Sequence, residues 1–408
     1  MLREQAPGLP ARARRDRAVT DASGAAPLRL GTRASLLATT QSGHVAAALR
    51  AATGREVELV PITTAGDVLT GPLAQLGGTG VFVAALRDAL LRGECDLVVH
   101  SMKDLPTAEV DGLAIAAVPP RAPVGDVLCA RDGLTLDTLP HGAVVGSGSP
   151  RRVAQLLRRR PDLQVRGIRG NVDTRLRKVD EGEYDAIVLA EAGLTRIGRT
   201  DRITDRFAAD GWPTSAGQGA LAVEVRSDSA VAAQIAAISD ADAEVTALWE
   251  RAVLRLLEAG CAAPVGISAR LAEAAGADVS TRSARSTTGG LVPVVERGPQ
   301  ARVETLGAAA GPDVSTRSAR STTGGLLPVV ERGPQARVET PVTLVAEVYA
   351  LDGARAVRVA HTAPREELAD AAGRDLAAAS VVAALMDAGA GDLADLGPRA
   401  TGAEGAAR

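Results

Sequence analysis

A regular alternation of short apolar runs and helical stretches dominates the middle of this 408-residue chain. Between residues 143 and 190, apolar runs typical of buried strands are separated by stretches of helical periodicity at 151–160 and 172–181. Strands that alternate with helices in this way form a parallel sheet covered by helices. A similar rhythm begins near residue 28, so the sequence predicts an α/β protein with more than one such unit.

Residues 96–106, DLVVHSMKDLP, form the most informative single stretch. Its apolar run reads as a buried strand that ends in Ser101, Lys103 and Asp104, and Pro106 prevents the strand from continuing. Open α/β sheets place their chemistry at the carboxyl ends of such strands. An isolated Lys-Asp pair more often lies on an ordinary solvated turn. Whether this pair belongs to such a turn or to a functional site therefore depends on the neighbouring motifs.

Several other strand ends are followed by a helix start and by arginine. Ser35, Ser149 and Asn171 are each placed as N-caps of a following helix. Helix N-termini offer unpaired N–H groups and a positive dipole end, and arginine pairs with carboxylates through two hydrogen bonds. Because the strand ends of a two-domain α/β protein converge on one cleft, the pattern predicts a ligand with several carboxylates. The arginines concerned are Arg33, Arg151, Arg152, Arg169, Arg175 and Arg196.

Two segments rich in proline and glycine, 119–123 and 213–220, indicate crossings between domains. The second crossing leads to a return strand at 222–225, so we expect a discontinuous first domain with two hinges. The predicted division is a disordered extension at 1–27, domain 1 at 28–120 and 218–238, domain 2 at 121–217, domain 3 at 241–390 and a loose tail at 391–408.

An internal duplication interrupts the third domain. Residues 278–305 recur at 313–340, with Leu327 in place of Val292 as the one difference. Two copies are too few to build a solenoid, and their Ser, Thr, Arg, Gly and Pro content buries little apolar surface. We therefore expect residues 276–341 to be largely an exposed, flexible insertion.

The three cysteines are widely spaced, which fits neither a disulfide framework nor a metal site and favours a reducing compartment. Cys95 and Cys129 lie in or beside strand patterns and are expected to be buried packing residues. Cys261 lies between glycine and proline on a loop, where its sulfur can be reached. A reachable thiol is either a nucleophile or attachment point or an inert loop residue, and local context does not decide which.

Composition argues against two classes of partner. The net charge is −3 and aromatic residues make up 1% of the chain, whereas nucleic-acid sites need a basic face and stacking rings. No run of about 18 apolar residues is present, so no membrane span is expected. The arginine-containing N-terminal residues lack an apolar core typical of a secretory signal. These features predict a cytoplasmic protein.

Taken together, the motifs resemble those of the hydroxymethylbilane synthase family, also called porphobilinogen deaminases. The resemblance runs from about residue 28 to residue 271 and resumes weakly near the C-terminus. It is carried by motifs in the family's order and approximate spacing, among them Thr32-Arg33-Ala34-Ser35, His100-Ser101-Met102-Lys103-Asp104-Leu105-Pro106, Ser149-Pro150-Arg151-Arg152, Arg169-Gly170-Asn171, Gly217-Gln218-Gly219 and Gly260-Cys261.

The resemblance implies an α/β fold of two doubly wound, periplasmic-binding-protein-like domains with hinges, plus a smaller α/β C-terminal domain. It implies a monomeric transferase, without a metal, that joins four porphobilinogen molecules with loss of ammonia on one covalent dipyrromethane cofactor. Cys261 matches the attachment cysteine and Asp104 the catalytic carboxylate. The implied cofactor- or substrate-binding residues are Arg33, Ser35, Phe82, Ser101, Lys103, Ser147, Ser149, Arg151, Arg152, Arg169, Gly170, Arg175, Arg196 and Gln218.

Two other classes of function fit parts of the sequence. A non-catalytic anion-binding protein of the periplasmic-binding type would explain the strands, hinges and arginines, but it would leave Asp104 and Cys261 without a role. An interaction protein that docks through the duplicated insertion is a weaker alternative. Substitution of Cys261 discriminates among them, because only the enzyme needs that thiol.

Overall fold

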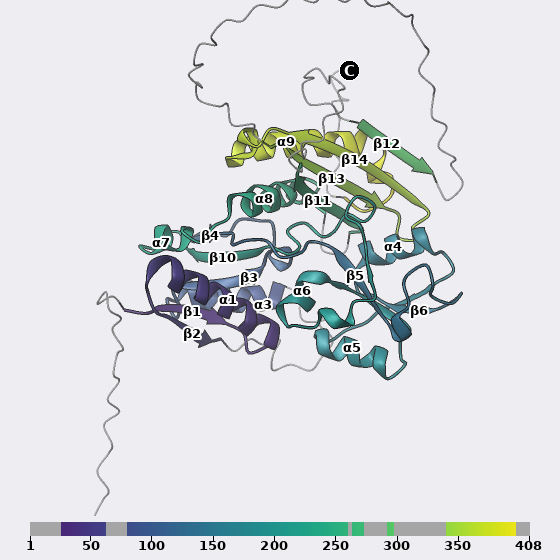
Figure 1. Cartoon of the computed structure of the whole chain (residues 1–408). Coiled ribbons are helices and arrows are strands. Elements are labelled where there is room, and N and C mark those ends of the chain that lie inside the picture. The colour runs from purple at the N-terminus through teal and green to yellow at the C-terminus, as the bar shows by residue number, and fades with distance from the viewer. Residues whose placement is uncertain (1–25, 63–79, 260–262, 273–291, 298–339, 397–408) are drawn as a thin grey trace, which may run out of the picture. The chain divides into compact units, whose positions relative to one another are not determined.

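The structure is a computed structural model that describes residues 26–62, 80–259, 263–272, 292–297 and 340–396, with the backbone alone at 80–82 and 292–297. Its strands form three sheets, whose elements are drawn in Figure 1. The chain divides into two compact units. The first unit comprises Met1–Gly125, Leu189–Ile203 and Gly217–Glu244, and the second comprises Asp126–Val188, Thr204–Ala216 and Val245–Arg408.

The sheet of the first unit has five strands in the order β2-β1-β3-β10-β4. Strands β1, β2 and β3 are parallel, and β10 pairs antiparallel with both β3 and β4. The predicted return strand is therefore confirmed as β10. The elements of this unit are β1 (Leu28–Thr32), α1 (Leu36–Thr53), β2 (Val57–Pro61), α3 (Gly80–Leu91), β3 (Leu97–Ser101), β4 (Leu113–Ala117), α6 (Glu191–Arg196), β10 (Leu221–Arg226) and α7 (Ala232–Ala236).

Helices cover both faces of this sheet because strand β3 is apolar on both sides. Leu97 and Val99 belong to one hydrophobic cluster with residues of α1. Val98, which points to the other face, belongs to a second cluster with residues of α3. Burying each such side chain contributes about 1.5–3 kcal/mol. This continuous apolar run is what fixes β3 at the middle of a doubly wound sheet.

The second sheet also has five strands, in the order β7-β6-β8-β5-β9. Strand β6 is parallel to β7 and β8, as the alternation of elements predicts, whereas β9 is antiparallel to β5. Its elements are β5 (Asp126–Ala130), β6 (Val144–Gly146), α4 (Pro150–Arg159), β7 (Gln164–Arg166), α5 (Val172–Asp180), β8 (Ala186–Ala190) and β9 (Asp205–Arg206).

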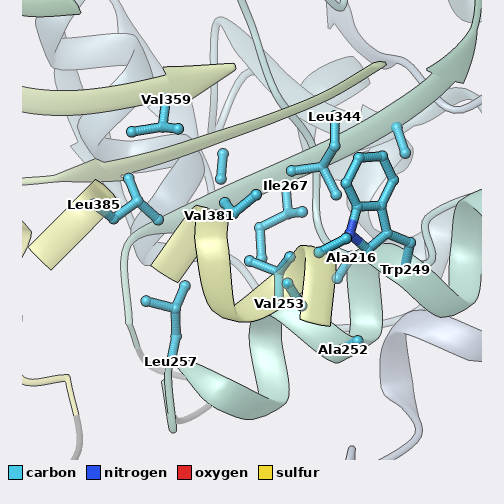
Figure 2. Packing of buried hydrophobic residues seen from close by; sticks show 14 of the residues in the cluster. Ala216, Trp249, Ala252, Val253, Leu257, Ile267, Leu344, Val359, Val381 and Leu385 are labelled. Carbon is cyan, nitrogen blue, oxygen red and sulfur yellow. The ribbon is translucent and has the colours of Figure 1, made fainter. Parts of the chain in front are cut away.

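The third sheet is antiparallel, in the order β11-β13-β14-β12. Figure 2 shows its core, in which Trp249 and Val253 of α8 and Val381 of α9 pack with Ile267 and Leu344 of the sheet. The elements are α8 (Ala241–Leu256), β11 (Val265–Leu271), β12 (Val292–Arg297), β13 (Val342–Tyr349), β14 (Arg355–Ala363) and α9 (Ala371–Asp387).

The predicted α/β class is confirmed by two five-stranded sheets and a smaller third one. Cys95 and Cys129 are buried, as expected. Within the duplicated insertion, one segment of the first copy forms the edge strand β12, and the rest lies outside the described residues. Most of the N-terminal extension and of the C-terminal tail also lies outside them, and the domain boundaries remain a prediction.

Candidate active site

The carboxyl ends of β1 and β3 lie at the same edge of the first sheet, because the strands are parallel neighbours. Arg33 and Ser35 follow β1, and Ser35 caps α1 by accepting a hydrogen bond from the Ala38 amide at 3.4 Å. Ser101 ends β3 and shares a 3.0 Å hydrogen bond with Gln41 of α1. The structure therefore brings two separate sequence motifs to one edge.

Residues Met102–Asp104 form a single 3₁₀ turn directly after β3. Met102, the first residue of the turn, and Leu105, which follows the turn, are buried, and the Met102 amide donates to the Ala220 carbonyl at 3.0 Å. Lys103 and Asp104 between them are exposed. In the part of the chain that the structure describes, Asp104 has no hydrogen bond or ion pair. The turn thus presents a carboxylate to solvent from a fixed backbone.

Gln218 links this turn to the crossing segments of the first unit. Its side chain is fully buried and accepts a hydrogen bond from Lys103 Nζ at 3.4 Å. Its amide Nε2 donates to the carbonyls of Val124 and Gly125, at 2.8 and 3.2 Å. Gly219 has φ +85°, and a Cβ there would lie 2.4 Å from a backbone oxygen. Gln218 therefore holds the backbone beside Lys103 instead of offering an exposed contact.

Arg196 lies at the end of α6 and donates to the Gly219 carbonyl at 2.7 Å. Burial lowers the pKa of Arg196 to about 10. A guanidinium that loses hydration in this way is stabilised by an anion. The part of the first unit that carries Asp104 therefore also carries several cations, namely Arg33, Lys103 and Arg196.

A buried charged cluster, which the sequence interpretation missed, lies on β3, β10 and α3. Glu224 accepts from Arg87 at 2.8 Å and lies 3.2 Å from His100 Nε2. Burial alone would raise the pKa of Glu224, but the hydrogen bonds with His100 and Arg87 outweigh it and hold that pKa below its ordinary value. The signal in the sequence was Glu224, a single carboxylate within the apolar run 221–225.

In the second unit, strands β6, β7 and β8 likewise end at one edge, with Gly146 level with Arg166 and with Ile187. Ser149 follows β6 and caps α4 by accepting from the Arg152 amide at 3.5 Å. Ser147 is buried, and its hydroxyl accepts from the Ser149 amide at 3.3 Å. The predicted serine and arginine motif is therefore assembled at a strand end.

The segment after β7 carries three more predicted residues. Gly170 has φ +112°, and a Cβ there would lie 2.8 Å from Thr174 Cγ2, so the turn requires glycine. Arg175 Nε donates to the Gly170 carbonyl at 2.7 Å, and Arg169 is exposed. Burial and the charge of Arg152 lower the pKa of Arg175. A cation whose pKa is lowered by burial and by a neighbouring like charge marks a place where an anion would be stabilised.

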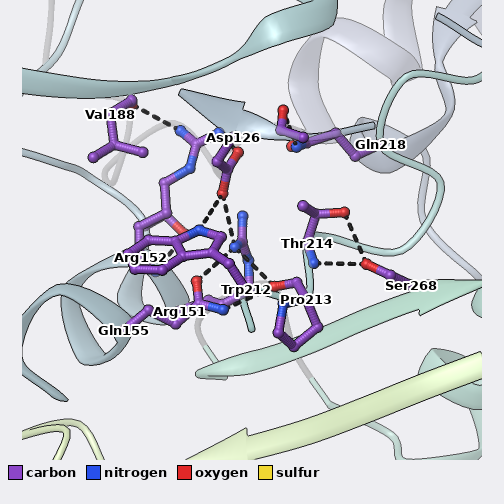
Figure 3. A network of polar contacts seen from close by, with 12 residues as sticks. Asp126, Arg151, Arg152, Gln155, Val188, Trp212, Pro213, Thr214, Gln218 and Ser268 are labelled. Carbon is purple, nitrogen blue, oxygen red and sulfur yellow. Dashed lines mark hydrogen bonds and ion pairs between the residues drawn. The ribbon is translucent and has the colours of Figure 1, made fainter. Parts of the chain in front are cut away.

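Arg151 and Arg152 are buried and share one carboxylate, that of Asp126 (Figure 3). Arg151 NH1 lies 2.9 Å from Asp126 Oδ2, and Arg152 NH2 lies 2.6 Å from Asp126 Oδ1. Trp212 Nε1 also donates to Asp126, at 3.0 Å. Sequence reasoning missed Asp126, whose signal was an acidic residue at the start of the apolar run DVLCA.

Two predicted residues cannot be placed by their side chains. Cys261 lies outside the described residues, four positions before β11 begins at Val265. Phe82 lies in α3, of which the structure describes only the backbone at that position. Within the described ranges, no helix has the length and apolar character needed to cross a membrane.

Residues 28–234 match the family model described as porphobilinogen deaminase, dipyromethane cofactor binding domain. The porphobilinogen deaminase of Leifsonia xyli is 56% identical over 249 residues, which are 60% of this chain and 76% of that protein. That of Thermobifida fusca is 56% identical over 242 residues, covering 59% and 76%.

The chain belongs to the porphobilinogen deaminase family. The matched range contains every predicted site residue of this family member except Cys261. A much looser likeness is to a Salmonella typhimurium periplasmic binding protein with high arginine specificity, at 16% identity and a TM-score of 0.30, covering 52% of this chain and 92% of that one.

The residues present fit the dipyrromethane cofactor of the porphobilinogen deaminase family. Its pyrrole units carry carboxylate side chains, and the second unit holds two buried guanidinium groups against one carboxylate. The Nε atoms of Arg151 and Arg152 are buried without a hydrogen-bond partner in the described structure. The cluster has an excess of positive charge and two buried N–H groups without an acceptor. A group that bears carboxylates would stabilise such an arrangement.

Proposed function

We propose that this chain is a hydroxymethylbilane synthase, a transferase of tetrapyrrole biosynthesis. It joins four porphobilinogen molecules head to tail and releases ammonia, giving the linear tetrapyrrole hydroxymethylbilane. The observation that carries the proposal is the membership in the porphobilinogen deaminase family together with Asp104, which is held exposed on an anchored turn beside cationic side chains.

Asp104 is assigned the catalytic role because of the charge that the reaction develops. When the aminomethyl C–N bond of porphobilinogen breaks, ammonia leaves with the bonding electrons and the pyrrole methylene becomes cationic. A fixed carboxylate next to that carbon stabilises the positive charge. The buried anchors Met102 and Leu105 keep the backbone of Asp104 in place, so little reorganisation is needed when the charge appears.

The cationic residues are assigned to the carboxylates of the growing chain. Each porphobilinogen carries an acetate and a propionate, so negative charge accumulates with every condensation. Arginine suits this task because its planar fork pairs with a carboxylate through two hydrogen bonds. The proposed binding residues are Arg33, Lys103, Arg152, Arg169, Arg175 and Arg196, with Ser35, Ser101, Ser147, Ser149 and Gly170 providing further polar contacts and Phe82 flanking the site.

For two of the predicted binding residues, Gln218 and Arg151, the surrounding contacts favour a supporting role over direct ligand binding. Gln218 is fully buried and already donates to two backbone carbonyls. Arg151 is enclosed by Asp126, Gln155 and the Pro213 carbonyl. We assign both residues to holding the binding groups in position.

Cys261 is the proposed attachment point of the dipyrromethane, which supplies a covalent primer for chain growth when it is bound. The thiol is proposed to lie in domain 3, at 241–390, and the protein to act as a cytoplasmic monomer without nucleic-acid or membrane partners. The other two cysteines are poor candidates because they are buried, and burial raises the pKa of the Cys95 thiol to about 11.

Intact mass spectrometry of the denatured protein tests this function. The wild type is expected to carry an increment of two linked porphobilinogen-derived units on the peptide that contains Cys261. Cys261→Ser should lose both the increment and turnover, whereas Cys95→Ser, the matched control at a buried thiol, should keep the increment. A wild type that stays unmodified after incubation with porphobilinogen would contradict the proposal and favour a non-catalytic binder.

A further inference from the structure

The carboxylate of Asp126 lies at the centre of a buried polar network in the second unit. Its side chain is fully buried at the start of β5, and its two oxygens accept from Arg151, Arg152 and Trp212 at 2.6–3.0 Å (Figure 3). One carboxylate facing two guanidinium groups leaves one positive charge in excess away from water. With three donors already in place, Asp126 itself has no part in contacting a ligand.

Arg151 is held in this network through its NH1 group. Its NH1 group donates to Asp126, to Gln155 Oε1 at 2.7 Å and to the Pro213 carbonyl at 3.1 Å. Gln155 in turn donates to the Pro213 carbonyl at 2.9 Å and to the Tyr349 hydroxyl of β13 at 2.8 Å. Arg151 therefore joins α4 to the Pro213 segment and, through Gln155, to the third sheet.

Arg152 is the next residue along α4, but its surroundings differ. NH2 is held by Asp126 at 2.6 Å and NH1 by the Val188 carbonyl at 3.0 Å. Its side chain is 10% exposed, against 3% for Arg151. It lies in the first turn of α4, two residues after Pro150, and its charge lowers the pKa of Arg175. Arg152 is thus fixed in direction and still near another cation of the predicted site.

We propose that Asp126 is a positioning residue that orients the Arg152 guanidinium toward a carboxylate of the cofactor or substrate, while Arg151 serves as the structural counter-charge of Asp126. This assignment rests on the proposed synthase function, and it divides two adjacent arginines into one that binds ligand and one that does not. The competing explanation is that the cluster stabilises the fold and nothing more.

A charge-balanced double variant separates these explanations. Asp126→Asn leaves two guanidinium groups without a carboxylate, so its melting temperature should fall. Asp126→Asn combined with Arg151→Gln removes one charge of each sign and restores the original net charge, so the melting temperature should recover. Arg152 still lacks its anchor in that double variant. Turnover per cofactor-loaded molecule should therefore stay reduced by about 10²-fold, as expected for a misplaced binding group.

The matched control is Asp162→Asn. Asp162 pairs with Arg160 at 2.7 Å beside the C-terminal end of α4, and its side chain is 16% exposed instead of fully buried. Its loading and turnover should match the wild type. Arg152→Lys provides a second test that keeps the charge but loses the fork: it should lower turnover per loaded molecule while the melting temperature stays close to that of the wild type.

Three measurements on purified full-length protein report the result: the loaded fraction by intact mass, the rate of porphobilinogen consumption per loaded molecule, and the melting temperature. Turnover that recovers together with the melting temperature in the double variant would overturn the positioning role, as would full turnover in Arg152→Lys. A wild type that carries no mass increment would instead overturn the proposed function, so the two failures are distinguishable.

Discussion

The carboxyl edges of the two units place their charges differently. In the first unit, Lys103 and Asp104 are exposed on a turn. The buried charges of Glu224 and its partners lie elsewhere, on β10, β3 and α3. In the second unit, Arg151 and Arg152 at the helix start are themselves buried. The first arrangement separates the charges that stabilise the fold from those proposed to react. The second combines, in one cluster, charges that stabilise the fold and a charge proposed to bind ligand.

The largest effect should come from the buried charges of the first unit. Glu224→Gln leaves the Arg87 guanidinium without its carboxylate, and breaking a buried pair in this way costs about 3–5 kcal/mol of unfolding free energy. Because Asp104 lies on the separate exposed turn, the molecules that remain folded should keep most of their turnover. Denaturant unfolding and turnover at a temperature below the transition measure the two quantities.

The matched control for that variant is Asp96→Asn, which breaks the Arg29–Asp96 pair in the same sheet. The side chains of that pair are 42% and 25% exposed, so the loss of stability should be much smaller. If turnover of folded Glu224→Gln fell as steeply as its stability, the separation of the two roles in the first unit would be wrong.

Asp104→Ala should give the opposite result. Removal of one electrostatic group of this kind costs on the order of 10²–10³ in rate, or about 2.7–4 kcal/mol. The unfolding free energy should change by no more than about 0.5 kcal/mol, because Asp104 is exposed and has no ion pair to lose within the part of the chain that the structure describes. Asp111→Ala, at another exposed aspartate of the first unit, should leave both quantities unchanged. Normal turnover by Asp104→Ala would refute the catalytic assignment.

Local sequence patterns predicted the parts of the site that local interactions build. Ser35, Ser149 and Asn171 each cap the helix that their position indicated, since an N-cap bonds to an amide three residues away. Asp126 and Glu224 were missed because their partners lie far along the chain: Arg151 is 25 residues from Asp126, and Arg87 is 137 from Glu224. Periodicity reports which face of a strand is apolar, but it does not report what a single buried carboxylate will meet.

In the third sheet, too, the local sequence does not reveal a long-range partner, in this case the pairing of one strand with another. Strands β11, β13 and β14 coincide with apolar runs in the sequence. The edge strand β12 was not predicted, because its Ser-, Thr-, Gly- and Pro-containing surroundings gave no sign that it would pair with β14. The roles of Asp104 and Cys261 came from resemblance to a family, since neither composition nor spacing assigns a reaction.

The smallest expected effect is the pH dependence of the stability that Glu224 contributes through its buried contacts with Arg87 and His100. The pKa of Glu224 is held below its ordinary value of 4.5 by Arg87 and His100, the charged and titratable groups that contact it. A carboxyl group with a lowered pKa in the folded state stabilises the protein above its unfolded pKa, and that contribution is lost as the pH falls through the folded value. Neutral Gln cannot titrate, so the wild type should lose its advantage over Glu224→Gln only below about pH 4.5. Melting temperatures of both proteins between about pH 3 and pH 7 measure this difference. An advantage that stayed constant to the acid end would mean that Glu224 does not contribute through its charge.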